Sequence, residues 1–117
     1  MSGYVDKIMD YKLLGEDYVR SKCPHYAIVR PGVLMSSASL LPSALEINQG
    51  DTIGGGITRD ELARVAVAAC QFSDQCTFEV FRRNSRIKLQ PEFPAISGKE
   101  HYGDSFEDLL SGITKDS

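Results

Sequence analysis

The sequence predicts an α/β fold, and three features of the chain support that prediction. Helical and strand-like segments alternate along the body of the chain, which is the order expected of layered α/β domains rather than of helix bundles. Residues 26–29 are continuously apolar, as in a parallel strand that is buried on both faces. Residues 76–81 alternate between apolar and polar side chains and are rich in strand formers, which predicts a second strand with one face more exposed.

The first segment, residues 5–21, has the periodicity of a helix that is apolar on two sides. At 100° per residue, one face carries Val5, Ile8, Met9, Lys12, Glu16 and Val19. The opposite side carries Tyr11, Leu14 and Tyr18. Such a helix is usually covered on both sides. Pro24 is expected to end it, and Pro31 and Gly32 are expected to end the strand that follows.

The middle of the chain contains a clear helix start. Residues 36–42 are expected to form a loop, 45–49 a short strand, and the glycine-rich stretch 50–56 another loop. Thr58 and Glu61 then have capping-box spacing, which predicts a helix over residues 59–72. Its inward-facing residues are expected to be Leu62, Val65, Ala66, Ala69 and Phe72.

The end of the chain is less regular. After a turn at 73–75 and the strand at 76–81, residues 86–90 are expected to continue that strand's hairpin. Residues 90–103 are expected to be mostly loop, and residues 105–112 a short capped helix. Residues 1–117 are therefore expected to form one domain, with a core over 5–82 and an irregular C-terminal extension over 83–117 that contains the short helix.

Composition and charge exclude several classes of protein. The chain has 117 residues, 42% hydrophobic and 25% charged, and a net charge of −3, so it lacks the basic character of nucleic-acid binders. No apolar run approaches the ~20 residues that a membrane span needs. The N-terminus lacks an export signal, and the three cysteines lack paired spacing. These features predict a soluble intracellular protein, of the cytoplasm or the plastid stroma.

Lys12 is the sharpest candidate for a functional residue. It lies within the apolar stripe of the first helix, where a charge is costly unless it is paired. One interpretation is a salt bridge to Glu16 one turn on, with the lysine stem lying along apolar surface. The other is a binding role for its ammonium group.

Three segments carry a resemblance to a known family. They are Ile-Met-Asp-Tyr-Lys-Leu-Leu-Gly-Glu at 8–16, Tyr-Ala-Ile-Val-Arg-Pro-Gly at 26–32, and Ile-Thr-Arg-Asp-Glu-Leu at 57–62. In this order they resemble the C-terminal half of an atypical short-chain dehydrogenase/reductase of the NAD(P)H-binding, NmrA-like group, over about Ile8 to Val80. The resemblance implies a Rossmann-like, doubly wound parallel sheet that lacks the N-terminal Gly-rich nucleotide-binding half.

The same resemblance implies roles for individual residues. Lys12 would donate hydrogen bonds to the nicotinamide ribose hydroxyls of NAD or NADP. The main chain around Pro31, Gly32 and Val33 would border the nicotinamide, where a glycine lets a ring approach closely. Ile8 stands where dehydrogenases have the catalytic tyrosine, so the phenolic general acid is missing.

Four further motifs have alternative interpretations. The loop at 50–56 has Arg59 where a dinucleotide fingerprint would need its last glycine, so it is not interpreted as one. Thr58, Arg59 and Asp60 match the family and are expected to cap and tether their helix. A thiol–imidazole site could draw on Cys23, His25 and His101, although their spacing favours none. A basic cluster that could hold an anion, or simply be a solvated strand end, comprises Arg82, Arg83, Arg86 and Lys88.

Two functions follow as hypotheses. The first is an NAD(P)-binding, reductase-like domain fragment that binds the nicotinamide side of the cofactor when completed by the missing half, and is inactive as an isolated chain. The second is a noncatalytic interaction or assembly module derived from that fold. Because sheet edges left without neighbours tend to pair with other chains, self-association or a larger protein complex is expected.

Overall fold

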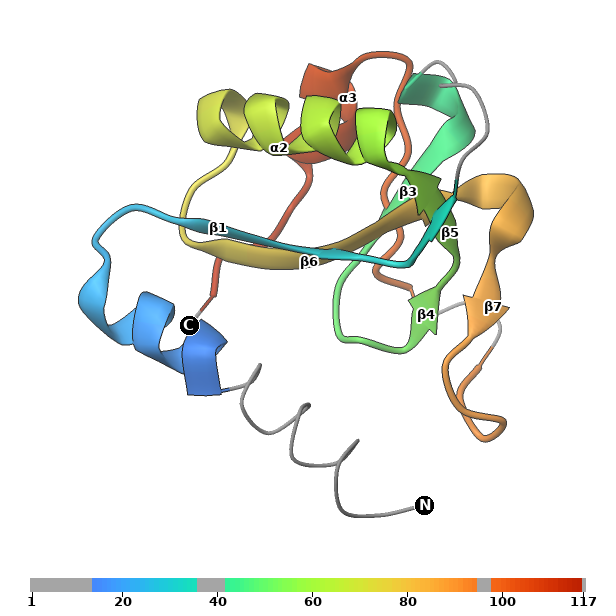
Figure 1. The fold of residues 1–117 in the computed structure, drawn as a ribbon, viewed down its shortest axis with the longest axis horizontal. Helices are drawn as coiled ribbons and strands as arrows, with labels where there is room; N and C mark the ends of the chain where they lie inside the picture. Colours follow the sequence, from blue (N-terminus) through green and yellow to red (C-terminus); the bar gives the residue numbers. More distant parts are fainter. Residues whose placement is uncertain (1–13, 36–41, 95–97, 117) are drawn as a thin grey trace.

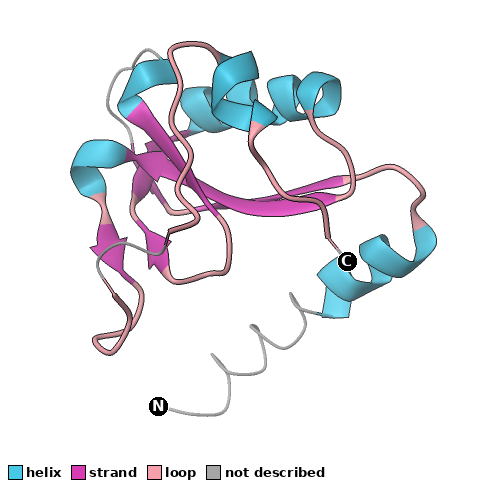
Figure 2. Ribbon diagram, turned by 180° about the vertical axis from the view of Figure 1, so that it is seen from behind, coloured by secondary structure: helices cyan, strands magenta, loops and turns pink. Residues whose placement is uncertain are grey.

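The computed structural model describes residues 14–35, 42–94 and 98–116. Its centre is a three-stranded sheet with the spatial order β1 (Ala27–Pro31), β6 (Cys76–Arg82) and β3 (Leu45–Asn48). Two helices cover one face of this sheet, α2 (Arg59–Phe72) and α3 (Phe106–Ser111), as Figure 1 shows. The helix at 14–22 lies on the other face, as the reverse view also shows (Figure 2). The layered α/β architecture is therefore confirmed.

The three-stranded sheet is mixed, with one parallel and one antiparallel pair of strands. β1 and β6 run parallel, with Ala27 opposite Cys76 and Pro31 opposite Val80. The connection between them spans residues 32–75 and contains β3, further short strands and α2, which leads directly into β6. Parallel neighbours require a crossover connection of this kind. β3 pairs antiparallel with the other edge of β6, with Ile47 opposite Val80. β6 is thus the central strand.

Two small ribbons extend the fold at one end of the sheet. β2 (Val33–Met35) pairs parallel with β5 (Gly56–Thr58). β4 (Ile53–Gly54) pairs antiparallel with β7 (Ile87–Lys88). The prediction of a plain loop over 50–56 is therefore wrong, because part of that stretch is held in these ribbons. The predicted hairpin partner of β7 is also wrong, since β7 pairs with β4 and not with β6.

Helix α2 begins where its sequence predicts. The Thr58 hydroxyl accepts a hydrogen bond from the Glu61 amide (3.1 Å), and the Glu61 carboxylate accepts one from the Thr58 amide (2.9 Å). This capping box and the bounds of the helix are confirmed. Val65 and Ala69 are buried as predicted, whereas Ala66 is exposed and Ala68 is buried in its place. The buried stripe is displaced because α3 packs beside α2 and covers Ala68.

β1 is less buried than predicted, and β6 is more buried than predicted. β1 is only half-buried, because no strand in the described part of the chain pairs with its outer edge. β6 is buried along its whole length instead of having an exposed face. Cys76, Phe78 and Val80 face α2, while the alternate residues of β6 are covered by the first helix, the ribbons and the C-terminal segment.

The C-terminal segment packs onto this core. His101 forms a β-bridge with Ile47, and Lys115 forms one with Cys76. The predicted capped helix is confirmed as α3, whose N-cap is Ser105. Leu109 and Leu110 of α3 are fully buried in the hydrophobic core. Short 3-10 turns at Pro42–Ala44 and Arg83–Ser85 complete the described elements.

Candidate functional site

The candidate site lies at the carboxyl edge of the parallel pair. In open α/β sheets this is the edge at which ligands collect. A cleft of about 320 Å³ opens there, and its wall includes Arg30 and the residues that the resemblance singled out, Pro31, Gly32 and Val33. β1 and the ribbon of β2 and β5 meet at this edge because the chain passes directly from β1 through Gly32 into β2, which pairs with β5. Lys12 and Ile8 lie outside the described residues.

The rest of the cleft is mainly apolar and comes from segments far away in the sequence. Both ribbon strands β4 and β7 contribute to it, together with β6. The apolar side chains of this wall are Ile53, Phe81, Ile87 and Leu89. Ile53 and Phe81 are fully buried, whereas Ile87 and Leu89 are substantially exposed. A flat, largely apolar group therefore fits this wall better than a strongly hydrated one.

Gly32 is required by main-chain packing within the wall. A Cβ atom at this position would lie 1.5 Å from the carbonyl oxygen of Gly55. The amide of the next residue, Val33, donates a hydrogen bond to that same carbonyl (2.9 Å). The absence of a side chain at Gly32 thus lets the main chain at Gly55 pack closely against it. This packing explains the glycine without a bound ring.

The floor of the cleft is polar and is centred on Glu79, which is only 5% exposed. Its Oε1 accepts hydrogen bonds from the Asp51 amide (2.7 Å) and the Asn48 side chain (3.1 Å). Its Oε2 lies 3.4 Å from a guanidinium nitrogen of Arg30. Burial raises the pKa of the Glu79 carboxyl. Glu79 was not predicted as a site residue, because its place in the alternating strand indicated a solvent-facing side chain.

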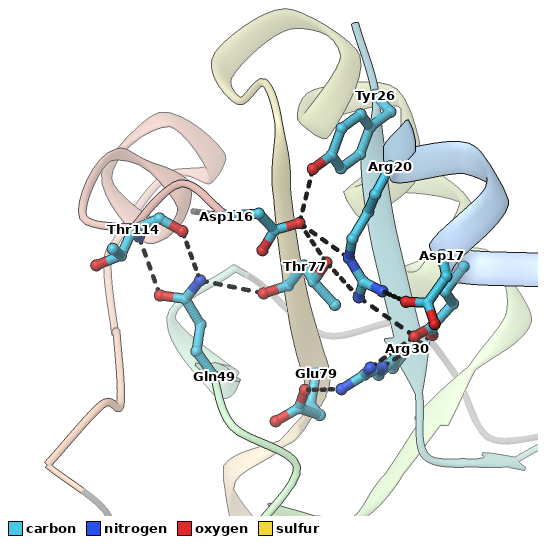
Figure 3. A network of polar contacts seen from close by, with 10 residues as sticks. Asp17, Arg20, Tyr26, Arg30, Gln49, Thr77, Glu79, Thr114 and Asp116 are labelled. Atoms are coloured by element: carbon cyan, nitrogen blue, oxygen red, sulfur yellow. Dashed lines mark hydrogen bonds and ion pairs between the residues drawn. The ribbon is translucent and has the colours of Figure 1, made fainter. Parts of the chain in front are cut away.

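Two arginines connect this floor to the first helix. Arg30 donates hydrogen bonds to both oxygens of Glu16 (2.9 and 2.6 Å), and Arg20 donates another to Glu16 (3.3 Å), as Figure 3 shows in part. The hydrogen bond from Arg30 is the main reason that the pKa of Glu16 is lowered. The same hydrogen bond raises the pKa of Arg30. Glu16, predicted as a partner of Lys12, therefore pairs with two arginines in the described structure.

The network continues to the C-terminal segment. Asp116 accepts hydrogen bonds from Arg20 (3.2 Å), from the Tyr26 hydroxyl (2.9 Å) and from the Thr77 hydroxyl (2.8 Å). Gln49 exchanges two hydrogen bonds with the main chain of Thr114 (2.8 and 3.0 Å; Figure 3). These contacts hold the first helix, β1, β6 and the C-terminal segment as one unit beneath the cleft.

Two residues of the basic cluster, Arg82 and Arg86, are paired with carboxylates within the protein. Arg82 is buried and pairs with Glu61 (2.9 Å), and Arg86 pairs with Glu46 (3.1 Å) and Glu100 (2.6 Å). Arg83 stacks on the Tyr102 ring, 4.2 Å from its centroid. The Lys88 ammonium donates to a main-chain carbonyl. A solvated strand end is therefore the wrong interpretation for Arg82, and nothing in these pairings favours an anion site.

The other predicted motifs do not assemble into a site. Thr58 caps α2, and Asp60 forms an exposed ion pair with Arg64 (3.2 Å), in keeping with a tethering role. All three cysteines are free, and His25 is paired with Asp74 (3.1 Å). Within 14–35, 42–94 and 98–116 no group of three or more His, Cys, Asp or Glu residues is placed to hold a metal ion.

No known protein family, curated protein or solved structure matches this chain. In the part of the chain that the structure describes, no helix combines the length and the apolar character needed to cross a membrane.

Proposed function

We propose that this chain is the nicotinamide-side part of an NAD(P)-binding, reductase-like domain, built as the C-terminal half of a Rossmann-like sheet. One observation carries the proposal. The Arg-Pro-Gly-Val segment at 30–33, which carries the family resemblance, lines a cleft at the carboxyl edge of the parallel strand pair β1 and β6. That edge is the position expected of a cofactor site in open α/β sheets.

Each residue has a defined part in this proposal. Lys12 holds the nicotinamide ribose hydroxyls, and Pro31, Gly32 and Val33 border the ring. The amide of Val33 is already bonded to Gly55, so Val33 contacts the ring through its side chain, which is 73% exposed. Ile8 supplies no phenol, and the chain by itself binds without catalysing hydride transfer.

The rest of the cofactor site comes from chain that pairs with the outer edge of β1. Among the described residues that edge is unpaired, and a groove of about 630 Å³ runs beside it. Small and apolar residues of β1 and α2 line this groove, including Ala27, Val29, Ala66 and Ala69. A further strand and its side chains would fill such a groove, as parallel sheets are normally covered on both faces.

A titration tests the proposal directly. We expect nicotinamide mononucleotide, added to the isotope-labelled chain, to shift the amide resonances of Gly32, Val33, Gly54 and Gly55 with millimolar affinity. Lys12→Ala should weaken this binding at least tenfold, which corresponds to about 1.4 kcal/mol. Lys22→Ala, at the exposed end of the helix at 14–22, is the matched control and should leave the binding unchanged. Absence of saturable shifts around the cleft would contradict the proposal.

The open edge of β1 favours a second candidate, a noncatalytic assembly module that pairs through this strand. Unpaired strand edges are templates for pairing with another chain. Leu14 and Tyr18, 62% and 65% exposed on the first helix, add apolar surface for a partner.

Sedimentation velocity tests this second candidate. We expect the sedimentation coefficient of the wild-type chain to rise with concentration. Val29→Lys, which places a charge beside the open edge, should shift the chain toward monomer. Val67→Lys, at a position of α2 that is 71% exposed and away from the edge, should not. A monomer over a wide concentration range would count against pairing through β1.

A further inference from the structure

The side chains that line the cleft carry more negative than positive charge. Two carboxylates, Asp51 and Glu79, and one cation, Arg30, line it. The charge of Arg30 is offset by Glu16, which approaches its guanidinium group to 2.6 Å from outside the lining. What a ligand meets in the cleft is therefore the two carboxylates and an apolar wall.

The buried Glu79 carboxyl group has one oxygen with two short hydrogen bonds and one oxygen with a longer contact. Oε1 accepts two hydrogen bonds of 2.7 and 3.1 Å, whereas among the described residues Oε2 contacts only the guanidinium group of Arg30, at 3.4 Å. The carboxyl group is nearly fully buried, so it acts through a medium of low dielectric constant. A positive charge placed near Oε2 would be attracted more strongly than at an exposed carboxylate.

Asp51 is positioned by the turn that follows β3. Gly50 and Asp51 both have positive φ angles, 106° and 59°. This turn directs the Asp51 amide at Glu79 and leaves the Asp51 side chain exposed at the rim of the cleft. The cleft is thus lined by one buried carboxylate, that of Glu79, and one exposed carboxylate, that of Asp51, both beside the apolar wall.

We propose that this cleft selects a flat, positively charged ring, and hence that it binds the oxidised pyridinium form of nicotinamide in preference to the neutral reduced form. This inference rests on the proposed function. The apolar wall accepts the ring faces, and Glu79 and Asp51 compensate the charge that only the oxidised ring carries. Burial raises the pKa of the Glu79 carboxyl, and a cation bound beside it would oppose that shift because it favours the charged form of the carboxyl.

Two small probes of equal ring size provide the test. They are the cation formed by methylating the pyridine nitrogen of nicotinamide, and neutral nicotinamide itself, each titrated into the full chain by NMR. We expect the cation to bind about tenfold more tightly at the cleft, a ratio typical of one partly buried ion pair. Glu79→Gln, which keeps the shape of the side chain, should bring the two affinities together.

Two further variants complete the experiment. Asp51→Asn removes the exposed charge while tolerating the positive φ, and should reduce the preference in part. Glu107→Gln, an exposed position on α3, removes the same charge far from the cleft and should leave the preference intact. Thermal unfolding of each variant shows whether it remains folded, and Asp51→Asn keeps the test decisive should Glu79→Gln not fold.

The outcomes separate this inference from the proposed function. Equal binding of both probes at the cleft, unaffected by Glu79→Gln and Asp51→Asn, would overturn charge selection and leave the proposed function standing. If neither probe gives saturable shifts at the cleft, both fail. A preference for the cation that Glu107→Gln abolishes would show general surface attraction and overturn the inference.

Discussion

Replacing Glu61 with alanine is expected to destabilise the protein by about 3–5 kcal/mol, since it removes one member of a buried ion pair. Glu61 is fully buried and pairs with Arg82 at 2.9 Å, itself only 7% exposed. The same carboxylate accepts hydrogen bonds from the Thr58 amide (2.9 Å) and hydroxyl (2.8 Å). A loss of this size is a large part of the ~5–15 kcal/mol that stabilises a typical domain. Urea unfolding followed by circular dichroism measures it.

Two comparisons show whether burial is the cause. Asp60→Ala breaks an ion pair with Arg64 on the same helix, but both side chains are more than half exposed (56% and 61%). Its effect should be at most about 0.5 kcal/mol. The double variant Glu61→Ala/Arg82→Met removes both charges and should recover much of the lost stability. Equal effects of Glu61→Ala and Asp60→Ala would show that the Glu61–Arg82 pair is not buried in solution.

Gly32→Ala is expected to destabilise the protein by about 3 kcal/mol, the upper part of the range for overpacking. The new Cβ would overlap the Gly55 carbonyl oxygen, at 1.5 Å, and that atom belongs to the main chain and cannot rotate away. The pairing of β2 with β5 must then open, which also disrupts the wall of the cleft. We expect a lower midpoint of urea unfolding and shifted amide resonances for Val33 and Gly55.

Gly15→Ala is the matched control. Gly15 lies in the helix at 14–22, and a Cβ atom there meets nothing within 4 Å. Alanine is favoured over glycine inside a helix by about 0.8–1.0 kcal/mol, so this variant should be more stable than the wild type. An unchanged unfolding midpoint for Gly32→Ala would contradict the packing of residues 32–35 against β5.

Replacements of Gly32 and of Glu61 are expected to affect the cleft differently. Gly32 is in the wall of the cleft, so its replacement should change ligand binding as well as stability. Glu61 lies on the opposite face of the sheet, toward α2. Glu61→Gln removes the charge of this side chain but keeps its size. It should lower the stability of the protein while leaving the affinity of the folded chain for nicotinamide mononucleotide unchanged. Binding and folding can thus be tested independently.

Elements with strong local signals were predicted well. The bounds of α2 follow from the capping box at Thr58 and Glu61, whose groups are three residues apart. β3, β6 and α3 were likewise recognised from periodicity and turn residues. The parallel direction of β1 was predicted from its continuous apolar character and is confirmed. Such signals act over a few residues, so the sequence expresses them directly.

The candidate site was predicted only in part. Pro31, Gly32 and Val33 were predicted as site residues through a resemblance and line the cleft, and their binding role stays a prediction. The polar floor was missed. Glu79 is bonded to Arg30, 49 positions earlier, and alternation in β6 gave no sign of that partner. The ion pairs of Arg82 and Arg86 in the basic cluster were missed for the same reason, since their carboxylate partners come from α2, β3 and the C-terminal segment.

By itself the sequence determined the starts of α2 and α3, the alternation of the strands and the α/β class, because capping, periodicity and proline or glycine geometry are local properties. Only the tertiary structure decided which charges are buried, which short ribbons form and what covers the second face of β6. Those outcomes depend on segments far apart, as in the bond from Arg20 to Asp116 across 96 positions. A buried charge is tolerated only when such a distant partner reaches it, and this is a property of the folded chain.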